Sequence, residues 1–416
     1  MSDNRVNSPR VITMGCRLNT LESEMIGAGL TENGINDAII INTCAVTTEA
    51  ERRARQTIRK LRRDNPEARL IVTGCAAQIS PETFADMEEV DRVVGNAEKL
   101  DPRILTGDGP TVEVSDIMEP GALEVPMISG FQERTRAFVQ IQQGCDHRCT
   151  FCIIPYARGP NRSIESDRII RQVRTMVENG HAEVVLTGVD ISSYDFCGLT
   201  LGSLAAMILE QVPELKRLRL SSLDPAAIDD DIYRLLADED RFMPHLHLSL
   251  QAADDMVLKR MKRRHSRTDA MDVIERARKA RPDVVFGVDL IAGFPTETDD
   301  MFNNTLSAIE DMMLTYLHVF PYSARPGTAA AKMPSVPGNV VRDRAARLRD
   351  AGQAAQMAYF KTCVGTEAEV LIEAGRKGHS RHFAPVKLTF DAPVGTITRA
   401  RIQSIDETAL LAGAAT

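Results

Sequence analysis

The sequence predicts an α/β protein with an amino-terminal open parallel-sheet domain, a central partial barrel of six strand–helix units and a small all-β domain at the carboxyl end. Apolar runs alternate with amphipathic helical stretches through most of the 416 residues, and only the tail changes to short alternating strands. A stretch rich in proline and glycine interrupts the alternation and is expected to be a linker. The predicted segments are 9–101, the linker 102–133, 134–363 and 364–416.

Three cysteines follow the strands of the first domain. Cys16, Cys44 and Cys75 each stand just past one of the apolar runs 11–14, 38–41 and 70–73, and helices are expected from Leu21, Thr48 and Pro81. A single cysteine there is usually a small apolar residue. The carboxyl ends of parallel strands meet at one edge of a sheet, however, so three equivalent thiols can converge. We infer a three-thiolate cluster.

A second cysteine group opens directly after the apolar run 138–141. Cys145, Cys149 and Cys152 form a CxxxCxxC triplet. Three thiolates hold a four-iron cluster and leave one iron open for a cofactor. The alternative, structural zinc, requires four ligands, and the nearby fourth candidate is His147. The triplet therefore favours an iron–sulfur cluster. Cys197 and Cys363 lack such spacing and are interpreted as incidental.

Composition limits the function classes. The apolar share of 43% is that of a folded protein, and no run approaches the roughly 20 apolar residues of a membrane span. A cytoplasmic protein with no membrane partner is expected. The net charge of −8 argues against a uniformly basic coat but not against local patches. The helix from Thr48 carries Arg55, Arg59 and Arg62, which could bind a phosphate backbone or form a solvated face.

Six apolar runs provide the expected barrel strands, and polar residues at their ends are candidates for cofactor binding. The runs are 138–141, 182–186, 216–220, 245–250, 284–291 and 314–320. A helix over 339–363 leads to tail strands at 368–372, 386–390, 395–405 and 409–412, with a basic loop at 376–382. This tail is expected to form a small β-barrel.

The sequence motifs resemble the methylthiotransferases of the radical S-adenosylmethionine (SAM) superfamily. The resemblance rests on the block 142–163 and on GCRLNTLESE, NTCAVT and GCAAQ around the first three cysteines. The tail is similar to TRAM, an RNA-binding module, although that match is weak, and Gln143 stands where relatives commonly have an acid. The motif GCRLNT at 15–20 is most similar to the branch that modifies N6-threonylcarbamoyladenosine beside the tRNA anticodon.

The resemblance implies two 4Fe–4S clusters and SAM as cofactors, and a tRNA and an unidentified electron donor as partners of a monomeric chain. It implies that the cluster on Cys145, Cys149 and Cys152 cleaves SAM, and that the cluster on Cys16, Cys44 and Cys75 carries the sulfur that is transferred. No catalytic residue beyond these ligands is assigned. Candidate SAM contacts are Arg158, Arg162, Thr187, Gly188, Ser221, Ser222, Ser249, Gln251 and Gly293.

Candidate substrate contacts are Arg17, Arg55, Arg59 and Arg62. Arg17 could pair with the carboxylate that a threonylcarbamoyl group carries and an isopentenyl group lacks, or could bond a helix end. Three alternatives stay open: methylthiolation of isopentenyladenosine in tRNA, methylthiolation of a ribosomal protein side chain, and a non-catalytic, metal-stabilised RNA-binding protein that would contain zinc.

Overall fold

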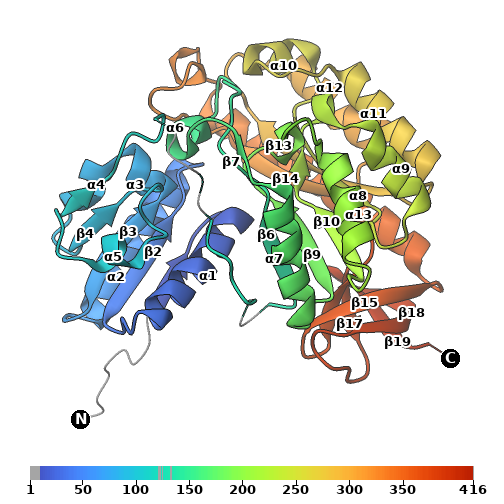
Figure 1. Cartoon of the computed structure of the whole chain (residues 1–416). Helices are drawn as coiled ribbons and strands as arrows, with labels where there is room; N and C mark the ends of the chain where they lie inside the picture. Colours follow the sequence, from blue (N-terminus) through green and yellow to red (C-terminus); the bar gives the residue numbers. More distant parts are fainter. Residues whose placement is uncertain (1–9, 120–122, 124, 132–133, 416) are drawn as a thin grey trace. The chain divides into compact units, whose positions relative to one another are not determined.

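The computed structural model describes residues 10–119, 123, 125–131 and 134–415, which form two compact units (Figure 1). Unit 1 comprises Met1–Ile128, Gln142–Ile164 and Ser323–Ala329, and unit 2 comprises Ser129–Ile141, Glu165–Tyr322 and Ala330–Thr416. Among the described residues, no helix combines the length and the apolar character needed to cross a membrane.

Unit 1 contains a parallel five-stranded sheet whose strands follow one another in chain order. The strands are β1 Arg10–Thr13, β2 Ala38–Thr43, β3 Arg69–Gly74, β4 Arg92–Val94 and β5 Val112–Glu113. The helices that connect them are α1 Arg17–Glu32, α2 Thr48–Asp64, α3 Cys75–Ile79, α4 Pro81–Ala85 and α5 Pro102–Thr106. The predicted open parallel sheet is therefore confirmed.

Helices cover both faces of this sheet because its strands are apolar on both sides. In β2, Ile39 and Ile41 pack in one core with residues of α2, α3 and α4, whereas Ala38 and Ile40 pack in another with residues of α1 and α5. Successive side chains of a strand point to opposite faces, so one run of buried residues serves two cores. Each fully buried isoleucine contributes about 1.5–3 kcal/mol.

The stretch predicted as a linker, 102–133, instead contributes α5 and β5 to unit 1. Pro102 occupies the first turn of α5, where a backbone N–H has no partner within the helix, so the missing N–H of proline costs no hydrogen bond. The Asp101 side chain caps the helix by accepting a hydrogen bond from the backbone N–H of Arg103 at 2.9 Å. Proline thus begins an element here rather than breaking one. Residues 120–122, 124 and 132–133 of this stretch lie outside the described residues.

Unit 2 contains the six predicted strands, all in parallel pairings, in sheets of order β10-β9-β6 and β11-β12-β13-β14. The six are β6 Arg136–Gln140, β9 Glu183–Thr187, β10 Arg217–Leu220, β12 His245–Gln251, β13 Val285–Ala292 and β14 Tyr316–Pro321, and the short β11 Ser222–Leu223 is a seventh strand that was not predicted. The accompanying helices are α7 Ser166–Glu178, η1 Ile191–Ser193, α8 Leu201–Gln211, η2 Pro225–Ala227, α9 Asp230–Asp238, α10 Asp255–Met261, α11 Arg267–Ala280, α12 Asp299–Asp311 and η3 Ala330–Lys332.

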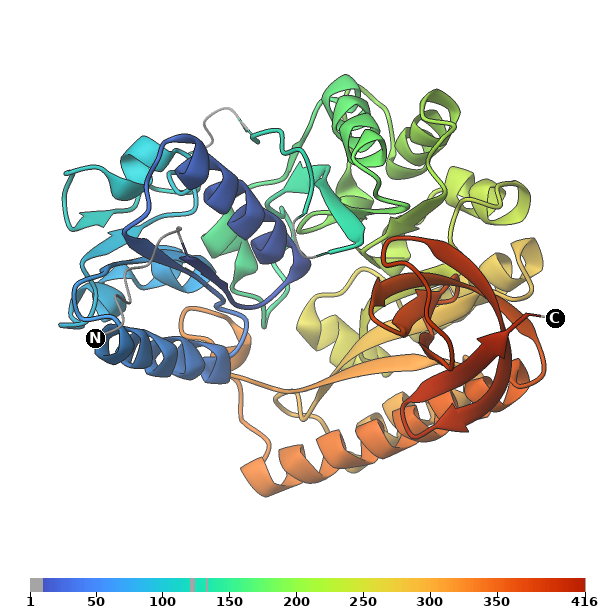
Figure 2. The same cartoon turned by 90° about the horizontal axis from the view of Figure 1, so that it is seen from below.

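A long helix, α13 Gly338–Cys363, leads into a closed five-stranded barrel at the carboxyl end (Figure 2). Phe360 of α13 lies in the barrel core. The strands are β15 Glu367–Ala374, β16 Lys377–Ser380, β17 Pro385–Leu388, β18 Ile397–Asp406 and β19 Ala409–Ala414. The predicted small β-barrel is confirmed, but the expected basic loop 376–382 contains β16. Sequence patterns do not predict this strand because glycine is a poor strand former. Gly378 is needed here because a Cβ at this position would collide with the backbone oxygen of Leu371.

Within unit 2, a loop of this barrel contacts charged residues on the strands of the central sheets. Phe383, at φ +65°, has the guanidinium carbons of Arg136 and Arg219 at 4.9 and 5.0 Å from its ring centre. Arg217 donates to the backbone oxygen of Glu369 at 2.9 Å. Cation–π contacts of this kind stabilise by about 0.5–2 kcal/mol each. The barrel is thereby fixed to the central strands.

The ion pairs between Glu183 and the neighbouring arginines predict that the free energy of unfolding falls in acid. Burial alone would raise the pKa of Glu183, but Arg219, at 2.7 Å, together with Arg136 and Arg217 lowers it to about 2. A folded-state pKa below the unfolded value of about 4.3 gives stability that is complete above that pH and is lost as the pH falls toward 2. In urea unfolding between pH 2 and 7, Glu183→Gln should be less stable than wild type at pH 7 and should lose less on acidification. Equal pH slopes would contradict this assignment.

Candidate functional site

The carboxyl edge of the unit 1 sheet brings Cys16, Cys44 and Cys75 together. Gly15 and Gly74, both at φ +94°, precede two of them, and a Cβ on Gly15 would lie 2.8 Å from the Cys44 sulfur. Cys44 and Cys75 are buried, and Cys16 is exposed. Burial, with further contributions from Cys75 and Cys16, raises the pKa of Cys44 to about 11. The thiols are thus close enough to influence one another.

Asn19 on α1 ties the cysteine-bearing loops together. Its amide nitrogen donates to the backbone oxygens of Met14 and Thr43, at 2.7 and 2.9 Å, which are the positions just before Gly15 and Cys44. Thr43 continues the connection by donating to the backbone oxygen of Thr73 at 2.5 Å. One buried amide and one hydroxyl therefore fix the ends of three strands relative to each other.

A buried guanidinium lies against this cysteine group. Arg158, on the short helix α6 Ile154–Arg158, has its Nε 3.1 Å from the Cys75 sulfur and also donates to Glu22 and Asn19. Glu22 in turn accepts from Lys99 at 2.6 Å. Burial would raise the pKa of Glu22, but Arg158 and Lys99 lower it to about 2.

The charges of this network suit a thiolate ligand. Two buried cations, Arg158 and Lys99, share the single carboxylate of Glu22, which leaves an excess positive charge beside Cys75. A buried cation needs an anionic partner. Deprotonated Cys75 would supply it, and thiolates are the form in which cysteines bind metal. Arg158 was predicted to contact SAM, but its donors are engaged at the first cysteine group, so its position favours a role there.

The second cysteine group lies in a loop between two short antiparallel strands of unit 1, β7 Gln142–Gln143 and β8 Arg162–Ser163. The Cys145 N–H donates to the Gly159 oxygen at 3.0 Å, and the Cys152 N–H donates to the Cys149 oxygen at 3.1 Å. The Gln142 side-chain amide donates to the Gly144 oxygen at 2.6 Å. All three cysteines are half-buried, so the loop holds thiols that a cluster could reach.

The predicted SAM contacts divide between the units. Arg158 lies in unit 1, as does Arg162, which is half-buried on β8, where burial lowers its pKa. The others lie in unit 2 at the carboxyl ends of β9, β10, β12 and β13, which is the end of a strand–helix barrel where ligands bind. These are Thr187, Gly188, Ser221, Ser222, Ser249, Gln251 and Gly293. The N–H of Gly293 donates to the Glu297 carboxylate at 3.0 Å.

The arginines predicted to bind substrate differ in how far their side chains are exposed and in their contacts within the protein. Arg62 donates to the backbone oxygens of Pro66, Ala68 and Glu89 and pairs with Asp91 at 2.6 Å, so it closes the end of α2. Arg59 keeps 54% of its side chain exposed beside Glu89, and Arg55 is half-buried. Arg17 is half-buried on the first turn of α1. The expectation for RNA binding therefore rests on Arg55 and Arg59 rather than on Arg62.

Sequence reasoning missed residues that shape these sites through long-range contacts. Glu22 and Lys99 were not singled out, and neither was Arg344, which holds Glu297 at 2.8 Å. Charged residues predicted inside helices are ordinarily solvent-exposed. The one sequence signal was Glu22 within the GCRLNTLESE motif.

Comparison with known proteins places both cysteine groups in recognised segments. The "Uncharacterized protein family UPF0004" matches residues 9–95, and the "Radical SAM superfamily" matches residues 139–309. Threonylcarbamoyladenosine tRNA methylthiotransferase MtaB of Rickettsia prowazekii is 48% identical over 95% of both chains. A tRNA-2-methylthio-N(6)-dimethylallyladenosine synthase of Rickettsia conorii is 31% identical over 88% of both. The radical SAM methyltransferase TsrM of Kitasatospora setae shares the fold, with a TM-score of 0.59 at 16% identity over 78% of this chain and 76% of that one.

Gly144 provides a test of the loop geometry. It has φ +75°, and a Cβ there would lie 1.8 Å from the backbone oxygen of Pro160. Gly34, at φ +68°, has no atom within 4 Å of such a Cβ and is the matched control. Gly34→Ala should cost only the roughly 1–2 kcal/mol of a left-handed alanine. Gly144→Ala should cost more and should also lower the iron bound after anaerobic reconstitution. Equal effects on unfolding and iron content would contradict a required close approach.

Arg158 provides a second test. Replacing it by glutamine leaves Glu22 paired with Lys99 but removes the charged hydrogen bonds that Arg158 donates to Glu22 and Asn19, and a bond of this kind contributes about 1.5–3 kcal/mol. Urea unfolding of the apoprotein should show this loss, whereas Arg103→Gln, which removes an exposed pair with Asp101, should change little. Similar stability of the two variants would show that Arg158 does not hold the network.

Proposed function

We propose that this chain, which belongs to the family of radical SAM methylthiotransferases, inserts a methylthio group at C2 of N6-threonylcarbamoyladenosine in tRNA, beside the anticodon. The observation that carries this function is the presence in one chain of two separate three-cysteine groups, each within a segment that matches the family. The 48% identity over 95% of a threonylcarbamoyladenosine tRNA methylthiotransferase supports the choice of substrate.

Two three-thiol groups suit two 4Fe–4S clusters with separate tasks. When bound, the cluster on Cys145, Cys149 and Cys152 supplies the electron that cleaves SAM, and the cluster on Cys16, Cys44 and Cys75 supplies the sulfur. The protein's own contribution is positioning: Asn19 fixes the first two strand-end loops, and Arg158 holds a positive charge at the Cys75 sulfur. Hydrogen bonds and charge at cluster sulfurs set the potential of a cluster. Arg158 therefore tunes the first cysteine group.

The substrate assignment rests on charge. Arg17 directly follows Cys16, and a guanidinium there matches the carboxylate of a threonylcarbamoyl group. The dimethylallyladenosine synthase, similar at 31% identity, supports isopentenyladenosine as the second candidate. The exposed Arg59 on α2, with the basic residues of the tail barrel, suits a phosphate backbone better than an acidic protein loop. A ribosomal protein side chain and a zinc-containing RNA-binding protein are the remaining alternatives.

Nucleoside mass spectrometry of tRNA from cells with and without the gene tests this function. Loss of the gene should remove 2-methylthio-N6-threonylcarbamoyladenosine and accumulate its precursor. Complementation with Cys44→Ala should fail to restore the product, although the purified variant still cleaves SAM, whereas Cys149→Ala should fail in both assays. Cys197→Ala, an exposed cysteine outside both groups, is the matched control and should behave as wild type.

Four outcomes would overturn parts of the assignment. An unchanged nucleoside profile would exclude the tRNA substrate, and loss of the isopentenyl species instead would move the chain to the second candidate. Zinc in place of iron and sulfide in anaerobically purified protein would exclude all three enzymatic candidates. Arg17→Ala should reproduce part of the product loss, and full activity of that variant would remove Arg17 from the substrate site.

A further inference from the structure

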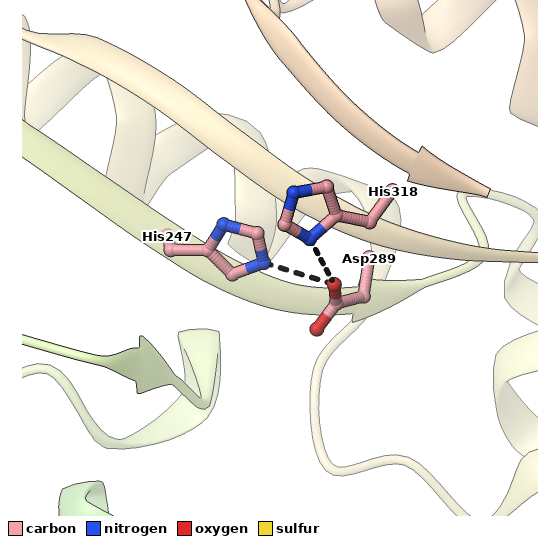
Figure 3. Close-up of side chains that lie close together, drawn as sticks. All are labelled: His247, Asp289 and His318. Atoms are coloured by element: carbon pink, nitrogen blue, oxygen red, sulfur yellow. Dashed lines mark hydrogen bonds and ion pairs between the residues drawn. The ribbon is translucent and has the colours of Figure 1, made fainter. Parts of the chain in front are cut away.

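Unit 2 contains a group of two imidazoles and one carboxylate that the proposed function does not use. His247 on β12, Asp289 on β13 and His318 on β14 lie on adjacent parallel strands, and Figure 3 shows both rings turned toward the aspartate. His247 Nε2 lies 3.0 Å from Asp289 Oδ1, and His318 Nδ1 lies 3.3 Å from the same oxygen. All three ligand atoms lie within 4.8 Å of one another.

We propose that His247, Asp289 and His318 form a binding site for one divalent transition-metal ion of the zinc and iron(II) class. Metal–ligand bonds of about 2.0–2.2 Å separate neighbouring ligand atoms by about 2.8–3.6 Å across octahedral and tetrahedral geometry. The two separations from Asp289 Oδ1, 3.0 and 3.3 Å, fall in this range. Two histidines and one carboxylate are a ligand set that zinc and non-haem iron(II) sites share.

The surroundings keep the ligands in place. A Cβ on Gly287 would lie 2.6 Å from His247 Nδ1, so the absence of a side chain at Gly287 makes room for the His247 ring. The Asp289 carboxylate lies between the two imidazoles, with one oxygen in contact with both His247 and His318, so the three candidate ligand atoms already face one another. A charged carboxylate and imidazole nitrogens are the forms that bind metal.

The site is also accessible. The exposed fractions of the side chains rise from 7% for His247 through 20% for Asp289 to 57% for His318. An ion can therefore enter from the side of His318 and keep water in its remaining positions, as in sites with three protein ligands. The ligand class is a hydrated divalent cation rather than a buried structural ion.

Other histidine–carboxylate contacts in unit 2 provide the comparison. His379 with Glu373, and His382 with Asp283, are both at 2.9 Å, and His265 lies 3.8 Å from Asp224. Each of these pairs offers a single imidazole, which serves a hydrogen bond but not a three-ligand site. The second histidine is what distinguishes the group of His247, Asp289 and His318.

The test is calorimetric titration of Zn²⁺ into the anaerobic holoenzyme, in which clusters occupy the six cysteines of the two groups, with iron content measured before and after. One Zn²⁺ per chain should bind without loss of iron. Asp289→Asn and His318→Gln should each weaken binding by more than about 100-fold, the upper end of what loss of an outer-shell partner costs. His382→Gln should bind as wild type. Because His318 is largely exposed, His318→Gln keeps the test valid if Asp289→Asn fails to fold.

The proposal is overturned if the wild-type holoenzyme binds no zinc, if zinc enters only in exchange for cluster iron, or if binding survives in both site variants. Equal loss in His382→Gln would also overturn it, because the ion would then lie elsewhere. These outcomes do not depend on the tRNA substrate, so the methylthiotransferase function and the metal site can fail separately.

Discussion

The hydrogen bonds and ion pair of the buried Arg158 guanidinium hold the first unit together. A charge removed from water is retained only where anions and acceptors surround it, and here Glu22, Asn19 and the Cys75 sulfur do so. These partners come from α1 and from the start of α3, while Arg158 follows the second cysteine loop on α6. One side chain thus joins a strand-end cysteine of the sheet to the segment that carries the second group of three cysteines.

This arrangement explains why the cysteine loop 142–164 packs with the first unit although its sequence leads into the central strands. The Asn96 amide donates to the backbone oxygen of Ala157 at 2.7 Å, and the same Asn96 accepts from Lys99. The polar network therefore continues from the helix of Arg158 back to the sheet. Buried networks of this kind are stable only when every member is satisfied, which makes the local geometry highly specified.

Sequence periodicity predicted most of the fold because apolar runs dominate it. Three strands of the first sheet, the six main strands of unit 2 and the loop positions of six cysteines follow directly from runs such as 38–41 and 138–141, whereas β4, β5 and β11, of two or three residues each, were not predicted. The elements missed were short and unusual in composition, such as β16 with its glycine and α5 with its initial proline. The partners of Arg158 and the pairing of His247 with Asp289 could not be predicted, because they join residues far apart in the chain. Periodicity carries no information on such contacts.

The contact of Phe383 with Arg136 and Arg219 limits how the carboxyl-terminal barrel can be deleted or replaced by that of another protein. Removing the carboxyl-terminal barrel would expose the ring's two guanidinium partners and take from Arg217 its acceptor on Glu369. The central strands would then hold three arginines around Glu183 with fewer compensating groups. A homologue without such a tail would need different residues at these strand positions. The barrel is therefore an integral part of the second unit, and a domain swap must carry both sides of the contact.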